Sequence, residues 1–322
     1  MGTKYFRYFR TEIAEAVTLS GQYAIQYAER ALNKHITVIL NEKEMKDRVV
    51  TIDTDSLIIS MDDFINTFKP KNPVEFLDQI SKRKIEPEID RLFKIFNDDI
   101  LHGYKPRLSM KREVIASGFF VAKKHYVLNI YDNEGVRYTK PKLKIKGLAA
   151  IKSSTPKLVR NSMKETFLLI LSRDRDKTMR YIDSIRKEFK SLPLERIAFP
   201  RGVSDLEKQM DQRTIYKKGC PIHVRAALLY NKMLNDSGLK TKYDPIRSGD
   251  KLKYVYLMTP NTLRENVIGF LSKLPPEFEL HEYIDYNTMF DKTFMKTIDP
   301  ILEIVGWGKT REIEETMGEF FA

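Results

Sequence analysis

The sequence of 322 residues predicts an α+β fold, with an antiparallel sheet first and a mainly helical domain after it. Two observations predict this class. Short β-branched runs separated by turn residues recur between residues 49 and 146, whereas helix patterns with clear start signals dominate after Gly147. The length suggests two domains, and a hydrophobic content of 42% is enough for their cores. We expect domains over residues 1–148 and 149–308, and a separate tail over 309–322.

The elements of the first domain follow from local patterns. A helix is predicted over residues 11–34, and a strand, turn and strand follow over residues 49–59. Asn72 and Pro73 have the residue types of a helix cap and first helical position, and Pro87 should break or kink that helix. Strands are predicted over residues 107–117, 119–131 and 136–146. The apolar face of the first helix comprises Ile13, Ala14, Val17, Ala24, Ile25, Ala28 and Leu32.

The second domain is predicted to be mainly helical. Thr155 followed by Pro156 is a helix start, with Thr155 as the cap. This helix is predicted over residues 155–172, and further helices are expected over residues 176–191 and 221–236. Gly238 should close the helix of residues 221–236 in the C′ role, and residues 284–305 should hold one or two more helices. One or two strands are expected around residues 251–258.

Two carboxylates lie at the predicted hairpin tip. Asp53 and Asp55 flank Thr54 between β-branched runs that would fix the backbone in a sheet. At this spacing they can share a divalent cation such as Mg²⁺, which prefers a carboxylate or two with water and phosphate oxygens. The pattern therefore suggests metal-assisted chemistry on a phosphate ester. A solvated turn is the alternative, because Asp and Thr favour turns.

Positive charge is concentrated in one segment. The net charge is +12, and residues 114–164 hold eleven Lys and Arg but two acids, which indicates a polyanionic partner. Within it, alternation along a strand would place four lysines on one face, about 6.6 Å apart. This is close to the phosphate spacing of one nucleic-acid strand, although lysines that protect an edge strand from aggregation would look the same. The four are Lys140, Lys142, Lys144 and Lys146.

Other features narrow the classes of protein. Lys124 and Tyr126 are predicted to share a strand face, where a basic group beside an aromatic can meet a nucleic-acid backbone. Nothing assigns His125 a catalytic role. The single cysteine, Cys220, excludes an intramolecular disulfide and a thiolate zinc site, so we expect a cytoplasmic protein. No apolar run reaches membrane-spanning length and no signal peptide is recognisable, so we expect no membrane partner. Met317, Phe320 and Phe321 stand in an acidic tail and either fold back or anchor in a partner's groove.

Several ordered segments resemble the family B DNA polymerases, specifically the T-even-type phage replicative enzymes. Residues 53–56 resemble motif C, and residues 111–132 resemble the palm strands that follow it. The family's lysine-lysine-arginine-tyrosine motif stands here as residues 123–126, with His125 in place of arginine. Residues 143–147 and 153–157 resemble the passage from palm to thumb, residues 220–225 and 284–290 resemble thumb segments, and the tail resembles a clamp-binding C-terminus.

The resemblance implies an α+β fold made of a partial polymerase palm and a thumb. It implies that Asp55 and Asp53 are catalytic metal ligands and that Glu113 is an acid near the metal. The implied cofactor is Mg²⁺, in a two-metal site that a second polypeptide completes. Residues 5–9 resemble the stretch after motif B, so the chain resembles the C-terminal piece of a split polymerase. Whether the split is natural or experimental is open.

The implied partners are an N-terminal polymerase fragment, primer-template DNA, dNTP and a sliding clamp. The clamp would bind Met317, Phe320 and Phe321. If the chain is phage-encoded, it would act in the host cytoplasm. The implied DNA-binding residues are Lys123, Lys124, Tyr126, Lys140, Lys142, Lys144, Lys146 and Lys157.

Two other classes of function stay open at this point. A glycosyltransferase also binds a metal nucleotide-sugar through an Asp-x-Asp motif, and duplex DNA binding would argue against it. A non-catalytic DNA-binding accessory, or a polymerase remnant, would tolerate loss of Asp55.

Overall fold

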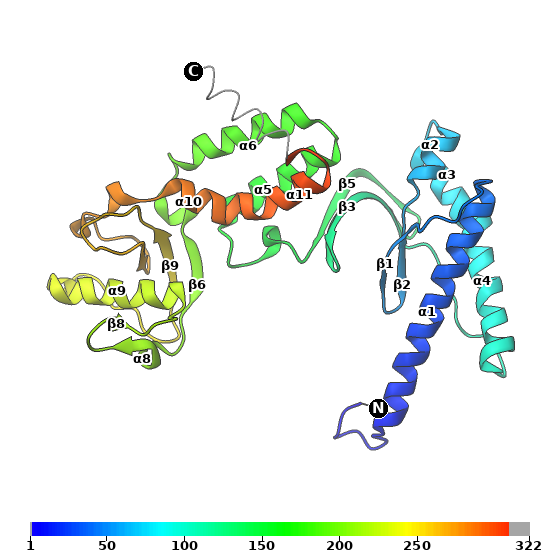
Figure 1. The fold of residues 1–322 in the computed structure, drawn as a ribbon, viewed down its shortest axis with the longest axis horizontal. Coiled ribbons are helices and arrows are strands. Elements are labelled where there is room, and N and C mark those ends of the chain that lie inside the picture. Colours follow the sequence, from blue (N-terminus) through cyan, green and yellow to red (C-terminus); the bar gives the residue numbers. More distant parts are fainter. Residues whose placement is uncertain (1, 309–322) are drawn as a thin grey trace. The chain divides into compact units, whose positions relative to one another are not determined.

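Figure 1 shows the computed structural model of the chain, which describes residues 2–308. Contacts divide it into two compact units: Met1–Ser117 with Ile130–Lys142, and Gly118–Asn129 with Leu143–Ala322. Each unit combines helices with small antiparallel sheets, so the predicted α+β class is confirmed. No helix within residues 2–308 is long and apolar enough to cross a membrane.

The first unit is built around a long helix, α1 (Thr11–Ile39), which confirms the helix predicted from residue 11. Its C-terminal half packs with Phe64 and Phe93 into the core of the unit. The other elements confined to this unit are β1 (Val49–Asp53), β2 (Ser56–Ile59), α2 (Asp62–Phe68), α3 (Pro73–Ile80), the π-helical turns η1 (Ser81–Ile85) and η2 (Phe96–Leu101), and α4 (Glu86–Ile95).

The start of the second predicted helix is confirmed, but the helix does not break at Pro87, because helical residues continue from α3 through η1, α4 and η2. Asn72 caps α3 by accepting a hydrogen bond from the Glu75 N–H, and Pro73 occupies the first position. The π-helical turn η1 then precedes Pro87. Proline cannot donate the backbone hydrogen bond of a regular helix, which accounts for the irregular turn next to it.

Three strands, β3 (Val114–Ala122), β4 (His125–Asn133) and β5 (Val136–Lys146), form a sheet in the order β3-β4-β5. The predicted break at Gly118 is wrong: Gly118 lies inside β3, and the turn falls at Lys123 and Lys124. A Cβ on Gly118 would lie 2.5 Å from a Leu128 methyl and 2.7 Å from the Val127 carbonyl oxygen. Glycine therefore permits the close approach of β4 and is not needed for a turn.

The second unit is mainly helical around one large core, as predicted. Its antiparallel sheet has the order β10-β9-β6, and sequence analysis missed β6 and β10. The helices are α5 (Lys157–Leu171), α6 (Arg175–Phe189), α7 (Leu194–Ile197), α8 (Leu206–Gln209), α9 (Ile222–Asp236), α10 (Tyr286–Phe290) and α11 (Lys296–Ile304). The strands are β6 (Phe199–Gly202), β7 (Met210–Asp211), β8 (Ile215–Tyr216), β9 (Lys251–Tyr256) and β10 (Val267–Phe270). Short turns are η3 (Ala149–Ile151), η4 (Leu239–Thr241), η5 (Pro276–Phe278), η6 (His281–Tyr283) and η7 (Asp291–Met295).

Two residues in this unit were predicted to mark the end and the start of helices, and only one of these predictions is confirmed. Gly238 follows α9 with φ of 70°, which confirms the C′ role. Thr155 is not the cap of α5, because the helix begins at Lys157 and Pro156 precedes it without a side-chain cap. Thr155 is instead buried, and its N–H donates to the Lys152 carbonyl. The two compact units do not divide at residue 148, and the functional assignment of residues 1–148, 149–308 and 309–322 stays a prediction.

Candidate functional site

The two predicted carboxylates lie at the tip of the β1-β2 hairpin. The strands are antiparallel, and Asp53 faces Ser56, so Thr54 and Asp55 alone form the turn. Thr54 has φ of 55°, a left-handed conformation that is rare for a β-branched residue. The Asp55 N–H donates to the Asp53 carbonyl at 2.6 Å. The predicted strand, turn and strand are therefore confirmed.

The second strand of the hairpin packs against the core of the first unit, whereas the tip of the hairpin is exposed to solvent. Leu57 and Ile59 of β2 pack against the core that α1, α2 and α4 build. Asp55 is exposed, and Asp53 is half-buried. The arrangement thus presents one free-standing carboxylate and a second, more enclosed one on a backbone that the core holds in place.

The carboxylates fit a magnesium ion only in part. Among residues 2–308, no three Asp, Glu, His or Cys side chains lie close enough to hold a metal ion. Asp53, Asp55 and Glu113 therefore do not make a three-ligand site by themselves. Two carboxylates still suit Mg²⁺, which binds one or two protein carboxylates together with water and phosphate oxygens. The predicted two-metal site, completed from outside these residues, stays a prediction.

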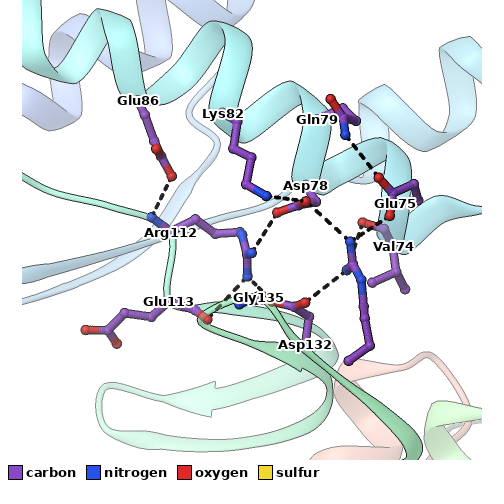
Figure 2. Close-up of polar contacts among 11 residues, drawn as sticks. Val74, Glu75, Asp78, Gln79, Lys82, Glu86, Arg112, Glu113, Asp132 and Gly135 are labelled. Atoms are coloured by element: carbon purple, nitrogen blue, oxygen red, sulfur yellow. Dashed lines mark hydrogen bonds and ion pairs between the residues drawn. The ribbon is translucent and has the colours of Figure 1, made fainter.

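Glu113 stands immediately before β3 with an exposed side chain. Figure 2 shows its carboxylate turned away from the charged groups behind it. Its backbone carbonyl accepts from the Glu134 N–H at 2.6 Å and from the Arg112 guanidinium at 3.4 Å. The main chain at Glu113 is therefore fixed, while its carboxylate stays available.

Behind Glu113 lie Asp78, Arg112 and Asp132 (Figure 2). With Arg137 they form what we call the ion ring. Arg112 donates to Asp78 Oδ1 at 2.6 Å and also pairs with Asp132. Arg137 lies 3.4 Å from Asp78 Oδ2 and 3.1 Å from Asp132 Oδ2. The Asp132 side chain is 0% exposed. Positive and negative charges therefore alternate around a largely buried ring.

Further contacts connect the ion ring to its surroundings. Lys82 and Arg112, in that order, hold the pKa of Asp78 below its ordinary value. The Gly135 N–H donates to Asp132 Oδ1 at 3.0 Å, and the Arg112 N–H donates to Glu86 at 3.1 Å. Helices α3 and α4 are thereby tied to the strands of the first unit. Sequence analysis missed this ring, because Asp78 and Arg112 are 34 positions apart and no local pattern joins them.

The basic and aromatic groups of residues 123–126 separate in the structure. Lys123 and Lys124 are exposed at the β3-β4 turn, and Lys124 has φ of 62°. The prediction that Lys124 and Tyr126 share a strand face is wrong, because Lys124 lies in the turn. Tyr126 is only 9% exposed: its ring centre lies 5.4 Å from that of Phe120 and 5.8 Å from the Lys146 ammonium. The DNA contacts assigned to these residues stay predictions.

The predicted lysine strand is confirmed as the C-terminal part of β5. Lys140, Lys142 and Lys144 are exposed, Lys146 is half-buried, and the intervening Leu143 and Ile145 pack against the core of the second unit. Within the described chain, β5 is an edge strand. The edge position is compatible both with phosphate binding and with protection against edge-to-edge aggregation. An aromatic also lies on the lysine face, because the Lys142 ammonium is 4.1 Å from the centre of the Tyr138 ring.

Lys157, the first residue of α5, lines an open pocket of about 500 Å³ in the second unit. Arg160, Arg196 and Lys253 line the same pocket, together with Glu195. The Nε of Arg160 is buried and has no hydrogen-bond partner among the described residues. Excess positive charge in a concave pocket favours an anionic ligand. Sequence analysis selected only Lys157. Arg196 and Lys253 reach the pocket from distant parts of the chain, whereas Arg160 lies one helical turn after Lys157 on α5.

The predicted clamp-binding residues Met317, Phe320 and Phe321 lie outside the described residues.

Comparison with known proteins identifies relatives that align with nearly the whole chain. The chain is 31% identical over 325 aligned residues to a DNA-directed DNA polymerase of Enterobacteria phage T4, and the alignment covers 95% of the chain. It is also 31% identical over 319 residues to a DNA-directed DNA polymerase of Escherichia phage RB69, with 93% of the chain covered. No family model matches the chain.

The chain spans about a third of the length of these curated relatives, since each alignment covers 35% of the phage polymerase. The hairpin carrying Asp53 and Asp55, the lysine strand and the helical unit all fall within a similarity that runs over nearly the whole chain. The chain is therefore homologous, over nearly its whole length, to the C-terminal part of the T4-type phage DNA polymerases.

Proposed function

We propose that this chain supplies the motif C half of the palm and the thumb of a DNA-directed DNA polymerase. The observation that carries the proposal is the similarity over 95% of the chain to a phage DNA polymerase, which includes the anchored hairpin of Asp53 and Asp55. A polypeptide bearing motifs A and B, the fingers and the proofreading exonuclease would supply the rest of the enzyme.

In this proposal Asp55 is the principal metal-binding carboxylate, Asp53 assists it, and Glu113 is an acid near the metal. The exposure of Asp55 at a rigid hairpin tip supports this role, because a carboxylate from another polypeptide can approach it there. Bound Mg²⁺ would supply charge stabilisation at the attacking and leaving oxygens of phosphoryl transfer. The hairpin contributes position, since a ligand must be held within about 0.5 Å of its working geometry.

The basic groups would bind the primer-template DNA. Lys123 and Lys124 are exposed at one turn, and Lys140, Lys142, Lys144 and Lys146 follow one strand face, as contact with successive phosphates requires. The pocket cations Lys157, Arg160, Arg196 and Lys253 would hold a further backbone segment of the duplex. Such contacts are independent of base sequence.

The remaining partners follow from the same proposal. The dNTP would bind chiefly to the polypeptide with motif B. A sliding clamp would bind the tail through Met317, Phe320 and Phe321. A short anchor of this kind binds modestly but raises the effective concentration of the enzyme on DNA. We place the complex in the host cytoplasm.

The proposal predicts complementation. The purified chain alone should show no primer extension, because no three metal-binding side chains lie close together among residues 2–308. Mixed with the polypeptide from the same source that carries motifs A and B, it should extend a labelled primer in the presence of dNTP and Mg²⁺. Gel analysis of the extended primer measures both reactions.

Two outcomes would count against the proposal. Extension by the chain alone would contradict the need for a second polypeptide. A mixture that binds primer-template DNA but never extends it would favour a non-catalytic DNA-binding accessory.

The lysine strand predicts a second result. Lys144→Ala and Lys146→Ala should each weaken binding to duplex DNA of any sequence. Each should also flatten the plot of log affinity against log salt by about one unit of slope, because one phosphate contact and its released counterions are lost. Fluorescence anisotropy of a labelled duplex at several salt concentrations measures the slope.

Lys240→Ala is a matched control, since Lys240 is an exposed lysine of the same unit outside β5. It should leave the slope unchanged. If Lys144→Ala also leaves the slope unchanged, the lysines of the lysine strand protect a sheet edge and do not bind phosphate. Lys144→Ala is the cleaner variant, because Lys146 additionally packs over the Tyr126 ring.

A further inference from the structure

The apolar stripe of α1 is buried along only part of its length. In the C-terminal half of the helix, Ala28, Leu32 and Ile36 are each 0% exposed within the core of the first unit. Their spacing of four residues keeps them on one helix face. That face is therefore the side of α1 that the sequence provides for burial.

The same apolar stripe continues into the N-terminal half of α1, where its side chains are exposed. Val17 lies seven positions before the buried Ala24, and Ile13 lies four before Val17, so all three share the face. Ile13 is 46% exposed and Val17 is 64% exposed. Leu19 and Tyr23 are also more than half exposed but lie on other faces of the helix, and the Tyr23 ring centre is 5.7 Å from that of Phe96. Figure 1 shows this end of α1, in dark blue, running beyond the other elements of its own unit.

The exposed apolar groups are not confined to the helix. Tyr5, Phe6 and Tyr8 precede it and are exposed, with Phe6 packed edge-on against Tyr8. Several large apolar side chains in one short segment exceed the isolated apolar groups normal on a surface, and such a patch marks an interface. Tyrosine is also enriched at interfaces, because it offers a rigid apolar ring and a polar end.

We propose that the N-terminal half of α1, through Ile13 and Val17, is the docking surface for the polypeptide that carries the remaining part of the polymerase. The length of the relatives supports this occupant: the chain matches only 35% of each phage polymerase, so most of such an enzyme lies outside it. The continuity of the stripe supports it too, because the partner would extend a core face that is already buried from Ala24 onward. The inference rests on the proposed function for the identity of the partner.

The test measures association directly. Wild-type chain, Ile13→Asp, Val17→Asp and Val38→Asp are titrated against the immobilised polypeptide bearing motifs A and B. Val38 is a matched control, because it is a valine of the same helix and is 70% exposed, yet lies outside the uncovered half. Ile13→Asp and Val17→Asp should each weaken association by about tenfold or more, and Val38→Asp by less than about twofold. Circular dichroism should show equal helix content in all four chains, since the replaced groups are exposed.

Primer extension gives a second readout. At saturating concentrations of the partner, Val17→Asp should extend primers at the wild-type rate, because the substitution weakens assembly and leaves the hairpin carboxylates intact. At limiting concentrations it should extend them more slowly.

The outcomes separate this inference from the proposed function. Wild-type affinity in both Ile13→Asp and Val17→Asp would overturn the docking surface, even if the assembled pair extends primers. A dimer of the chain alone that Val17→Asp dissociates would identify a second copy as the occupant and would also overturn it. If the wild-type pair associates through this face but never extends a primer, the docking surface stands and the proposed function fails.

Discussion

Asp55→Ala should lower the turnover of the assembled polymerase by about 1,000-fold while leaving its affinity for primer-template DNA nearly unchanged. Loss of a metal-binding carboxylate removes several kcal/mol of charge stabilisation that acts only in the transition state, and about 4 kcal/mol corresponds to this change in rate. The lysines, by contrast, contact DNA equally before and during reaction, so ground-state binding persists. Single-turnover primer extension and anisotropy of labelled DNA measure the two quantities.

Asp62→Ala is a suitable control for this variant. Asp62 is also an exposed aspartate and lies just beyond β2, at the start of α2. Its replacement should leave turnover within about twofold, as is usual for surface substitutions. A large loss of DNA affinity in Asp55→Ala with a modest loss of turnover would show that Asp55 has been given the wrong role. Unchanged turnover would support a non-catalytic accessory.

The hairpin could be predicted from sequence because its determinants are local. Apolar β-branched residues on both sides of Asp53, Thr54 and Asp55 fix two strands, and a tight turn is the only connection that fits between them. The cap of α3 was predictable for the same reason, since Asn72 and Pro73 act within one turn of helix. The alternating lysines of β5 likewise depend only on the period of a strand.

The predicted turn between β3 and β4 was placed at Gly118, which is wrong. A glycine is needed at this position for packing against the neighbouring strand and not for a turn. Gly118 is the residue that suggests a break, but the side chain of Leu128 on the next strand requires its lack of a Cβ. The actual turn at Lys123 and Lys124 contains none of the usual turn residues. Long-range packing therefore overrode local propensity at this position.

The surroundings of the candidate site could not be predicted from the sequence either, because they depend on tertiary packing. The pocket around Lys157 gathers Arg196 and Lys253 from α7 and β9, and only the fold brings them together. The burial of Tyr126 depends on Phe120 and Lys146, which flank it from two other strands. Residue type and periodicity identify candidates, whereas exposure and partners come from tertiary packing.

The ion ring leads to the second large effect that we expect. Asp132→Ala should destabilise the first unit by about 3–5 kcal/mol, because removing one partner of a buried ion pair leaves uncompensated charge. Here Arg112 and Arg137 would both lose a carboxylate that is 0% exposed, and the Gly135 N–H would lose its acceptor. Urea unfolding of the full chain, followed by hydrogen exchange of the α3 and β4 amides, should locate the loss.

Glu75→Ala provides the matched control within the same group of contacts. Glu75 pairs with Arg137 at 2.9 Å, but its side chain is 51% exposed. Exposed ion pairs contribute about 0–1 kcal/mol, so this variant should unfold nearly as the wild type does. If Asp132→Ala costs no more than Glu75→Ala, the ion ring is not an anchor between helix α3 and the strands.

Low pH should weaken the ion ring, and the pKa of Asp78 gives the direction of this effect. Lys82 and Arg112 hold the pKa of Asp78 below its ordinary value of 3.8 in the folded chain. A carboxyl group with a lowered folded-state pKa binds fewer protons when folded, so its stabilisation is fully present above pH 3.8 and is lost as the pH falls through the folded-state value. Asp78→Asn should therefore reduce the free energy of unfolding at neutral pH and flatten its decline below pH 3.8. A decline as steep as that of the wild type would assign the acid sensitivity to other carboxylates.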